Sequence, residues 1–282
     1  LNCANNQLTS LVVLSDSLTK VDCYVNKLET LDLTSVPNLK SLRCDQNSLK
    51  SLDLSNNQSL TSINCTYNNL TSLDLSKNTS LANVTNAMIG NQSVSLKANF
   101  DGNMIVIPFE NSNLDNDNYV SSTLDDYGDG SGFNFESFIA YDVSEIDGGI
   151  EYYCNTKLAG SENMKVSVTV SRDFHQVSFY ADSENTSLIG RAFANDGQSV
   201  TAPEIKNPPQ CKVLDTWSDT LDNVTGDKSI YANWKDAHSY SLSSFSNDTA
   251  TVKCSACGDT FTLSFINAVN SKKGDEKYSP YL

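Results

Sequence analysis

The sequence predicts a chain that is mainly β, in which a solenoid of leucine-rich repeats is followed by smaller β modules. Cysteines recur at steps of 20, 21 and 21 residues, at Cys3, Cys23, Cys44 and Cys65. Leucines keep the same period around each cysteine, in the pattern L-x-x-L-x-C-x-x-N-x-L-x-x-L-x-L. A fixed period of roughly 20–29 residues with this leucine pattern is typical of a leucine-rich-repeat solenoid. From about residue 88 the period is lost, and short alternating strands with Gly and Asp turns indicate β modules instead.

Each repeat is expected to contribute one short strand. Apolar positions alternate around the cysteine, so Leu42 and Cys44 face the core while Arg43 and Asp45 face the other side. Strands of successive repeats should stack in parallel, about 4.8 Å apart. A fifth unit begins at Leu81 and Val84 but has Asn86 where the cysteine belongs. Each unit then buries its leucines mainly against its neighbours.

The recurring cysteines and asparagines are both predicted to be structural. Strong metal motifs place ligands roughly two to four residues apart, whereas these cysteines are about 21 apart, so we expect a ladder of buried free thiols. An asparagine follows each cysteine by three residues, where the chain must bend, and its amide can bond backbone groups left unpaired by the turn. These asparagines are Asn6, Asn26, Asn47 and Asn68. The N-x-S/T triplets at Asn57, Asn78 and Asn223 are best explained mostly as products of the repeat pattern.

The cysteine ladder, together with L-D-L-S segments at 52–55 and 73–76, resembles the internalin family of bacterial surface proteins over residues 1–87. The resemblance implies a cell-surface or secreted bacterial protein that binds an extracellular protein or glycan through the concave face of its repeats. Seven side chains on the inner strands and their exits would form that surface: Asp22, Tyr24, Arg43, Asp45, Asn64, Thr66 and Tyr67. Tyr and Arg are frequent anchors of interfaces.

Residues 88–172 are predicted to form a β-sandwich that covers the open end of the solenoid. Residues 94–109 read as two strands around a Gly102-Asn103 turn, and two further strands lie near 149–155 and 164–170. Internalin-like proteins commonly carry an immunoglobulin-like domain here, so the resemblance implies an immunoglobulin-like β-sandwich.

The acidic connection from Glu110 to about Gly132 contains several possible calcium ligands. Its candidate ligands are Asp115, Asp117, Asp125, Asp126 and Asp129. The calcium-loop pattern is not matched, because Tyr119 and Tyr127 fall on ligand positions. We therefore expect a solvated loop without a metal.

Residues 173–235 resemble the internalin B-repeat, a small β-grasp module. Four segments carry this resemblance. Residues 175–180 are predicted to form a strand, and the Gly-x-x-Val-x-x-Pro segment at 197–203 a turn and a strand. Residues 213–218 and 224–234 follow, and the last segment ends in Tyr-Ala-x-Trp. The sequence departs from the family pattern at Cys211, Val213 and Thr216. Trp217 and Trp234 could stack on a sugar, but core roles are favoured because so small a domain needs large buried side chains.

The segment 236–282 holds a C-x-x-C pair, Cys254 and Cys257, with His238 upstream. Zinc usually takes four ligands, and this segment supplies three candidates, so a local disulfide or free thiols are favoured and no metal is predicted. The strands expected on both sides of the pair argue against a redox motif, which would open a helix. The chain begins inside a repeat at Leu1 and ends without a polar tail, so we expect it to be a piece of a longer protein.

Composition limits the possible functions. The net charge of −15, from 19 basic and 34 acidic residues, argues against nucleic acid and anionic membranes as partners. The sequence has no run of about 18 apolar residues, which a membrane-spanning helix would need. The two histidines lie in separate modules, and no nucleotide or nucleophile motif is present, so we expect no enzyme and no cofactor. A monomeric binding protein is favoured over a structural stalk, with a carboxylate-pair hydrolase a distant third.

Overall fold

A computed structural model describes residues 1–81, 87–109, 114, 117–127, 129, 131–134, 137–159, 163–246 and 249–264. The described residues are mainly β and form five sheets. They belong to two compact units, one of Leu1–Gln176 with Phe193–Asp196, the other of Val177–Ala192 with Gly197–Leu282. In the described part of the chain, no helix has the length and apolar character needed to cross a membrane.

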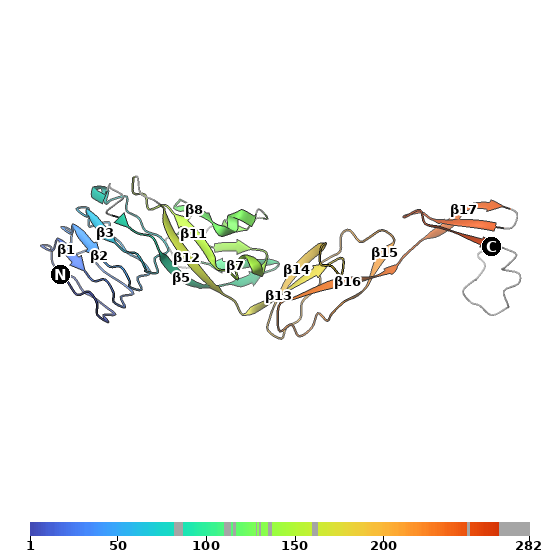
Figure 1. The fold of residues 1–282 in the computed structure, drawn as a ribbon, viewed down its shortest axis with the longest axis horizontal. Helices are drawn as coiled ribbons and strands as arrows, with labels where there is room; N and C mark the ends of the chain where they lie inside the picture. The colour runs from blue at the N-terminus through green and yellow to red at the C-terminus, as the bar shows by residue number, and fades with distance from the viewer. Residues whose placement is uncertain are drawn as a thin grey trace. The chain divides into compact units, whose positions relative to one another are not determined.

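The repeats form a parallel four-stranded sheet in the order β1-β2-β3-β4 (Figure 1). The strands are β1 (Lys20–Asp22), β2 (Ser41–Arg43), β3 (Ser62–Asn64) and β4 (Ala87–Met88). Val21, Leu42 and Ile63 lie opposite one another, so the 21-residue period of the sequence is the register of the sheet. These three side chains are buried, and the residues on either side of each one face away from the core. Of the predicted fifth unit, Leu81 is buried, whereas Val84 and Asn86 lie outside the described residues.

The ladder cysteines are free thiols in the core behind this sheet. Cys23, Cys44 and Cys65 are completely buried, whereas Cys3, in the first turn, is partly exposed. Burial raises the pKa of Cys23 and of Cys65 to about 12, and it raises the pKa of Cys44 well above its ordinary value. The predicted ladder of buried free thiols is confirmed for these three residues, which pack as small hydrophobic groups.

The raised thiol pKa values predict that stability falls in alkaline solution. An unfolded thiol ionises near pH 9, whereas Cys23 and Cys65 stay protonated until about pH 12. Above pH 9 the unfolded chain therefore binds fewer protons than the native chain, so the free energy of unfolding decreases as pH rises. The melting temperature, followed by circular dichroism, should drop between about pH 9 and 12. Cys65→Ala should melt at a lower temperature at neutral pH, but its melting temperature should decline less in alkaline solution. An identical decline would show that the buried thiols do not cause the alkaline loss of stability.

The asparagines after the cysteines bond the backbone of neighbouring turns. The amide of Asn68 donates to the carbonyls of Cys44 and Cys65, each at 3.0 Å, and its oxygen accepts from the backbone N–H of Leu49 at 3.0 Å. Asn47 makes equivalent bonds one turn earlier, and Asn26 does so two turns earlier. Their predicted structural role is confirmed, because these amides pair backbone groups that the turns leave without strand partners.

Two further sets of polar side chains extend this network. Gln92 takes the asparagine position after the last turn, donating to Cys65 O at 2.9 Å and accepting from Leu70 N at 3.2 Å. Asn57 and Asn78 are completely buried, and each donates to two backbone carbonyls. Their N-x-S/T triplets are thus part of the repeat core, as the sequence indicated.

Residues after the repeats form two facing sheets of a β-sandwich, in the orders β6-β7-β10-β9 and β5-β12-β11-β8. The first contains β6 (Asn99–Asp101), β7 (Met104–Pro108), β9 (Gly132–Asn134) and β10 (Ser137–Ala140). The second contains β5 (Gln92–Lys97), β8 (Tyr119–Ser122), β11 (Ile150–Cys154) and β12 (Met164–Ser171). Asp101 pairs with Met104 across the Gly102-Asn103 turn, which confirms the predicted hairpin at the turn. The single strand predicted before this turn is wrong, because the chain divides there into β5 and β6, which belong to different sheets. Phe109, Phe138 and Tyr152 pack edge to face or tilted in the core, with ring centroids 5.0–5.5 Å apart.

The sandwich contacts the last turn of the repeats, and one apolar core runs through both. The hydroxyl of the buried Tyr152 donates to the carbonyl of Thr71 at 2.6 Å. The backbone N–H of Leu75 donates to Thr156 O at 2.8 Å. Backbone groups at this end of the repeats are therefore paired by the sandwich.

The described part of the acidic connection contains regular elements, which the prediction of a loop missed. It contains β8 and a 3-10 helix, η3 (Thr123–Tyr127). Asp125 Oδ2 accepts hydrogen bonds from the Tyr119 hydroxyl at 2.6 Å and from Ser122 N at 2.7 Å. This carboxylate thus closes the turn after β8, while Asp115 lies outside the described residues.

The second unit contains most of a four-stranded sheet in the order β14-β13-β16-β15. Its strands are β13 (Phe174–Tyr180), β14 (Leu188–Asn195), β15 (Lys212–Trp217) and β16 (Lys228–Asp236). The strand predicted within 197–203 is wrong, because this segment contributes only a single bridge between Gln198 and Val224. Trp217 packs edge to face on the buried Phe179 at 5.0 Å, and Trp234 Nε1 donates to Ala181 O at 2.7 Å. Both tryptophans are half-buried by the sheet, in agreement with the core roles favoured above.

A last antiparallel sheet contains β17 (Tyr240–Ser246), β18 (Thr249–Cys254) and β19 (Thr260–Ser264). Cys254 ends β18, and the turn through Cys257 and Gly258 leads to β19. Gly258 has a φ of 78°, which favours glycine at this position.

Candidate functional site

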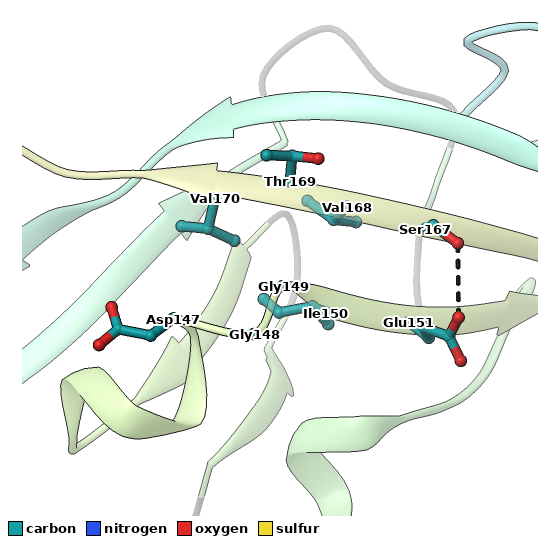
Figure 2. Close-up of a pocket in the computed structure, with 9 residues that line it drawn as sticks. All are labelled: Asp147, Gly148, Gly149, Ile150, Glu151, Ser167, Val168, Thr169 and Val170. Carbon is teal, nitrogen blue, oxygen red and sulfur yellow. Dashed lines mark hydrogen bonds between the residues drawn. The ribbon is translucent and has the colours of Figure 1, made fainter.

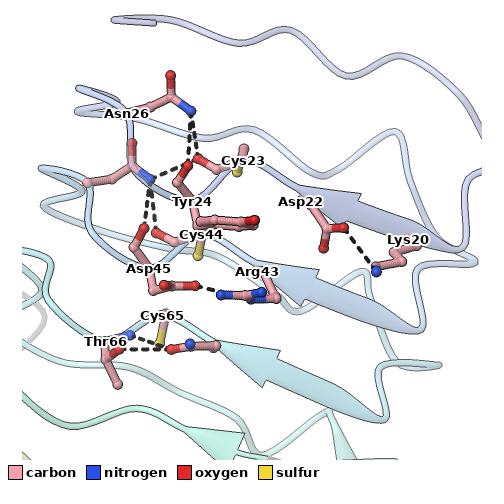
Figure 3. A network of polar contacts seen from close by, with 12 residues as sticks. Lys20, Asp22, Cys23, Tyr24, Asn26, Arg43, Cys44, Asp45, Cys65 and Thr66 are labelled. Carbon is pink, nitrogen blue, oxygen red and sulfur yellow. Dashed lines mark hydrogen bonds and ion pairs between the residues drawn. The ribbon is translucent and has the colours of Figure 1, made fainter. Parts of the chain in front are cut away.

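The strand face of the repeats carries a row of side chains in register. Asp22 lies opposite Arg43, Arg43 opposite Asn64, and Asn64 opposite Met88 on the four parallel strands. Tyr24, Asp45 and Thr66 follow two residues after the first three of these (Figure 3). The repeat period therefore brings together residues that are far apart in the sequence.

Arg43 is fixed at the centre of this face. Its guanidinium carbon lies 4.0 Å from the centroid of the Tyr24 ring, and its Nε lies 3.5 Å from Asp45 Oδ1 (Figure 3). The ring contributes cation–π attraction and Asp45 contributes opposite charge. The side chain stays 44% exposed, so the cation remains accessible to a partner while its orientation is restricted. Less conformational entropy is then lost when a partner binds.

Three of the seven predicted contact residues are buried, which corrects the sequence prediction. Asp22 pairs with Lys20 Nζ at 3.0 Å, and Asp45 lies beside Arg43. Thr66 donates its hydroxyl to Asn64 Oδ1 at 2.8 Å. Strand spacing of about 4.8 Å lets side chains of adjacent repeats cover these shorter residues. They orient their neighbours and offer little surface to a ligand.

Two exposed apolar side chains complete the surface. Tyr67 is 59% exposed and has a φ of 55°. It lies in the turn that follows β3, which places it at the edge of the strand face. Met88 is 55% exposed and lies in the row of Arg43. Met88 was missed because 24 residues separate it from Asn64, whereas earlier steps are 21. The buried Gln92 occupies the asparagine position 24 residues after Asn68, so it shows the same three-residue lengthening of the last step.

The chemistry of the strand face suits non-covalent recognition. Its accessible groups are a guanidinium, a phenol, a thioether and the amide of half-buried Asn64. Thiols behind the sheet stay neutral because burial raises their pKa values. The face can therefore pack against apolar groups and donate charged hydrogen bonds to a carboxylate.

A second candidate is a hollow between the start of β11 and the end of β12, which are neighbouring central strands of their sheet (Figure 2). It is lined by residues 147–151 and 167–170, and its volume of about 240 Å³ is below that of most ligand pockets. Its two carboxylates are both engaged, Asp147 with Arg172 at 3.4 Å and Glu151 with Lys165 at 2.7 Å. The hollow is a weaker candidate than the strand face.

The structure also brings a fourth residue to the C-x-x-C pair. Cys211, His238, Cys254 and Cys257 place their possible ligand atoms within 4.8 Å of one another. The sequence analysis found His238, Cys254 and Cys257 and did not include Cys211. The sequence nevertheless held a signal. Cys211 directly precedes β15 and His238 follows β16, and because these strands pair antiparallel, both residues lie at the same end of the pair.

Comparisons with known proteins find similarity to solved structures. No family model matches the chain, and no curated protein matches it. A solved structure described as the functional domain of InlJ from Listeria monocytogenes, which includes a cysteine ladder, is 19% identical over 61% of this chain and 52% of that chain, with a TM-score of 0.22. The chain spans about half the length of that structure.

Proposed function

We propose that this chain is part of an internalin-like bacterial surface or secreted protein that binds an extracellular partner and performs no catalysis. Residues 1–87 would be its leucine-rich-repeat solenoid, 88–172 an immunoglobulin-like cap, 173–235 a B-repeat-like β-grasp module, and 236–282 a further small β segment. The parallel sheet with a 21-residue register and the buried thiol ladder support this proposal.

The observation that carries the binding role is the position of Arg43. A guanidinium held between an aromatic ring and a buried carboxylate, on a surface with exposed Tyr67 and Met88, has the composition of an interface centre. A partner with a carboxylate beside an apolar group would pair with Arg43 and pack on the two apolar side chains. An extracellular protein offers this combination more often than a neutral glycan.

Replacing both Arg43 and Tyr67 by Ala should weaken binding by about 2 kcal/mol or more, roughly thirtyfold. The partner would first be identified by screening the labelled chain against arrays of extracellular proteins and glycans, and affinities would then be measured by surface plasmon resonance. Stability should barely change, because exposed side chains contribute little to the core.

The matched control replaces Lys50 and Tyr153, an exposed cation and an exposed tyrosine outside the strand face. This control should bind like the unmodified chain. Unchanged binding in Arg43→Ala/Tyr67→Ala, with loss on replacing Trp217 or Trp234 in a folded chain, would place the site in the second unit. Absence of any partner would favour the structural stalk.

A further inference from the structure

We propose that Cys211, His238, Cys254 and Cys257 form a tetrahedral zinc site that stabilises the C-terminal part of the second unit. This site is independent of the proposed binding role. Three thiols and one imidazole are a common ligand set of structural zinc sites. All four residues belong to the second unit.

The distances between the ligand atoms suit one metal ion. Cys211 Sγ lies 3.4 Å from Cys254 Sγ, and Cys257 Sγ lies 3.3 Å from His238 Nδ1. A tetrahedron with zinc–sulfur bonds of about 2.3 Å has sulfur–sulfur edges of about 3.8 Å. Shifts of a few tenths of an ångström would therefore fit the ion.

Backbone contacts bring the four residues together from separate segments. The N–H of Ala237 donates to Cys211 O at 2.9 Å, which places His238 beside Cys211. The N–H of Ser255 donates to Ser239 O at 3.3 Å and links the start of β17 to the turn after β18. Within that turn, Gly258 N donates to Cys254 O at 3.0 Å. The ligand positions are thus fixed by the backbone.

The chemistry of the four residues favours a cation. Their possible ligand atoms, three sulfurs and one imidazole nitrogen, lie within 4.8 Å of one another. Thiolates at such distances repel one another unless a positive ion lies between them.

Neighbouring side chains hold the imidazole in a ligand orientation. The His238 ring stacks on Tyr240 with centroids 5.2 Å apart, and its Nε2 lies 3.8 Å from Asp236 Oδ1. Nδ1 faces the thiols, while Nε2 faces this carboxylate beyond hydrogen-bond distance. The same carboxylate oxygen accepts from Lys212 Nζ at 2.6 Å. A carboxylate on the far side of a metal-bound histidine orients the ring and raises its basicity.

The β17–β19 sheet has little apolar core among the residues that the structure describes. Its only buried apolar residues there are Ala250 and Cys254, whereas Leu242 and Phe245 are mostly exposed. Three-stranded sheets of this size need additional stabilisation, which a structural metal can supply. Zinc bound by residues next to β15, β16 and β18 would link this sheet to the preceding one.

The experiment uses the full chain, kept reduced, stripped with a chelator and titrated with Zn²⁺ or Co²⁺. We expect one ion per chain, and the cobalt form should show the visible absorption of tetrahedral Co²⁺ with a thiolate charge-transfer band. Cys211→Ser should lower zinc affinity by at least about a hundredfold, because removing a direct ligand should cost at least as much as removing an outer-shell partner. Asp236→Asn should cost roughly tenfold. Cys3→Ser, a change to a partly exposed thiol of the first unit, should leave metal binding unchanged.

A second measurement separates metal binding from general unfolding. Zinc should protect the backbone amides of β17, β18 and β19 from hydrogen exchange without changing the protection of β1, β2 and β3. Failure of the reduced chain to bind zinc stoichiometrically would overturn the proposal, as would equal affinity in Cys211→Ser. Purification with a Cys211–Cys254 disulfide and no metal uptake after reduction would instead identify a redox-linked pair.

Discussion

A chain that ends at residue 86 should aggregate, or melt far below one that ends near Arg172. Removing the sandwich leaves Thr71 O without the Tyr152 hydroxyl and Leu75 N without Thr156 O. It also opens the continuous core at the last turn, where Leu73 and Leu75 are buried. Each leucine that becomes fully exposed costs about 1.5–3 kcal/mol. Two such losses are a large part of the roughly 5–15 kcal/mol that stabilises a typical domain.

Thermal unfolding of both fragments by circular dichroism, with light scattering to detect aggregates, would measure this difference. Tyr152→Phe in the longer fragment is the matched control, since it removes only the hydroxyl bond and should cost about 1–3 kcal/mol. Equal melting temperatures of the two fragments would show that the repeats are stable without a cap.

Asn68→Ala should destabilise the chain by about 3 kcal/mol, the largest expected effect of a single substitution here. The change leaves the carbonyls of Cys44 and Cys65 and the N–H of Leu49 without the amide that pairs with them. Each buried polar group left unpaired costs about 1–3 kcal/mol, and partial access of water should reduce the sum.

Asn6→Ala is the control, because Asn6 is exposed and donates only to Cys3 O and Ala4 O in its own turn. It should cost less than about 1 kcal/mol. Urea unfolding at neutral pH would compare the two variants. Similar losses in both would mean that the amide network between turns contributes little.

The repeat architecture was largely predictable, because neighbouring units have nearly the same sequence. The period of the cysteines predicted the register that places Val21, Leu42 and Ile63 side by side. Burial of Cys44 and the role of Asn47 followed from the same local pattern. The segment after Gly197 was mispredicted as a strand, because its apolar spacing is compatible with a strand but its backbone has only one bridge.

The candidate surface was predictable only in part. The exposed Arg43 and Tyr67 follow from strand alternation and turn position, which are local properties. Burial of Asp45 depends on side chains of adjacent repeats, and the position of Met88 depends on a three-residue lengthening of the last step. Neither property is encoded in the alternation within a single unit.

The sequence by itself determined the period, the core positions of the repeats and the C-x-x-C turn, because each depends on residues close together in the chain or on copies of one unit. Only the tertiary structure decided that Cys211 joins His238, Cys254 and Cys257. Cys211 precedes Cys254 by 43 residues, and they meet because β15 pairs with β16 and the turn after β18 lies against the start of β17. Strand pairing over such separations depends on packing across the whole module, which a local pattern of residues does not specify.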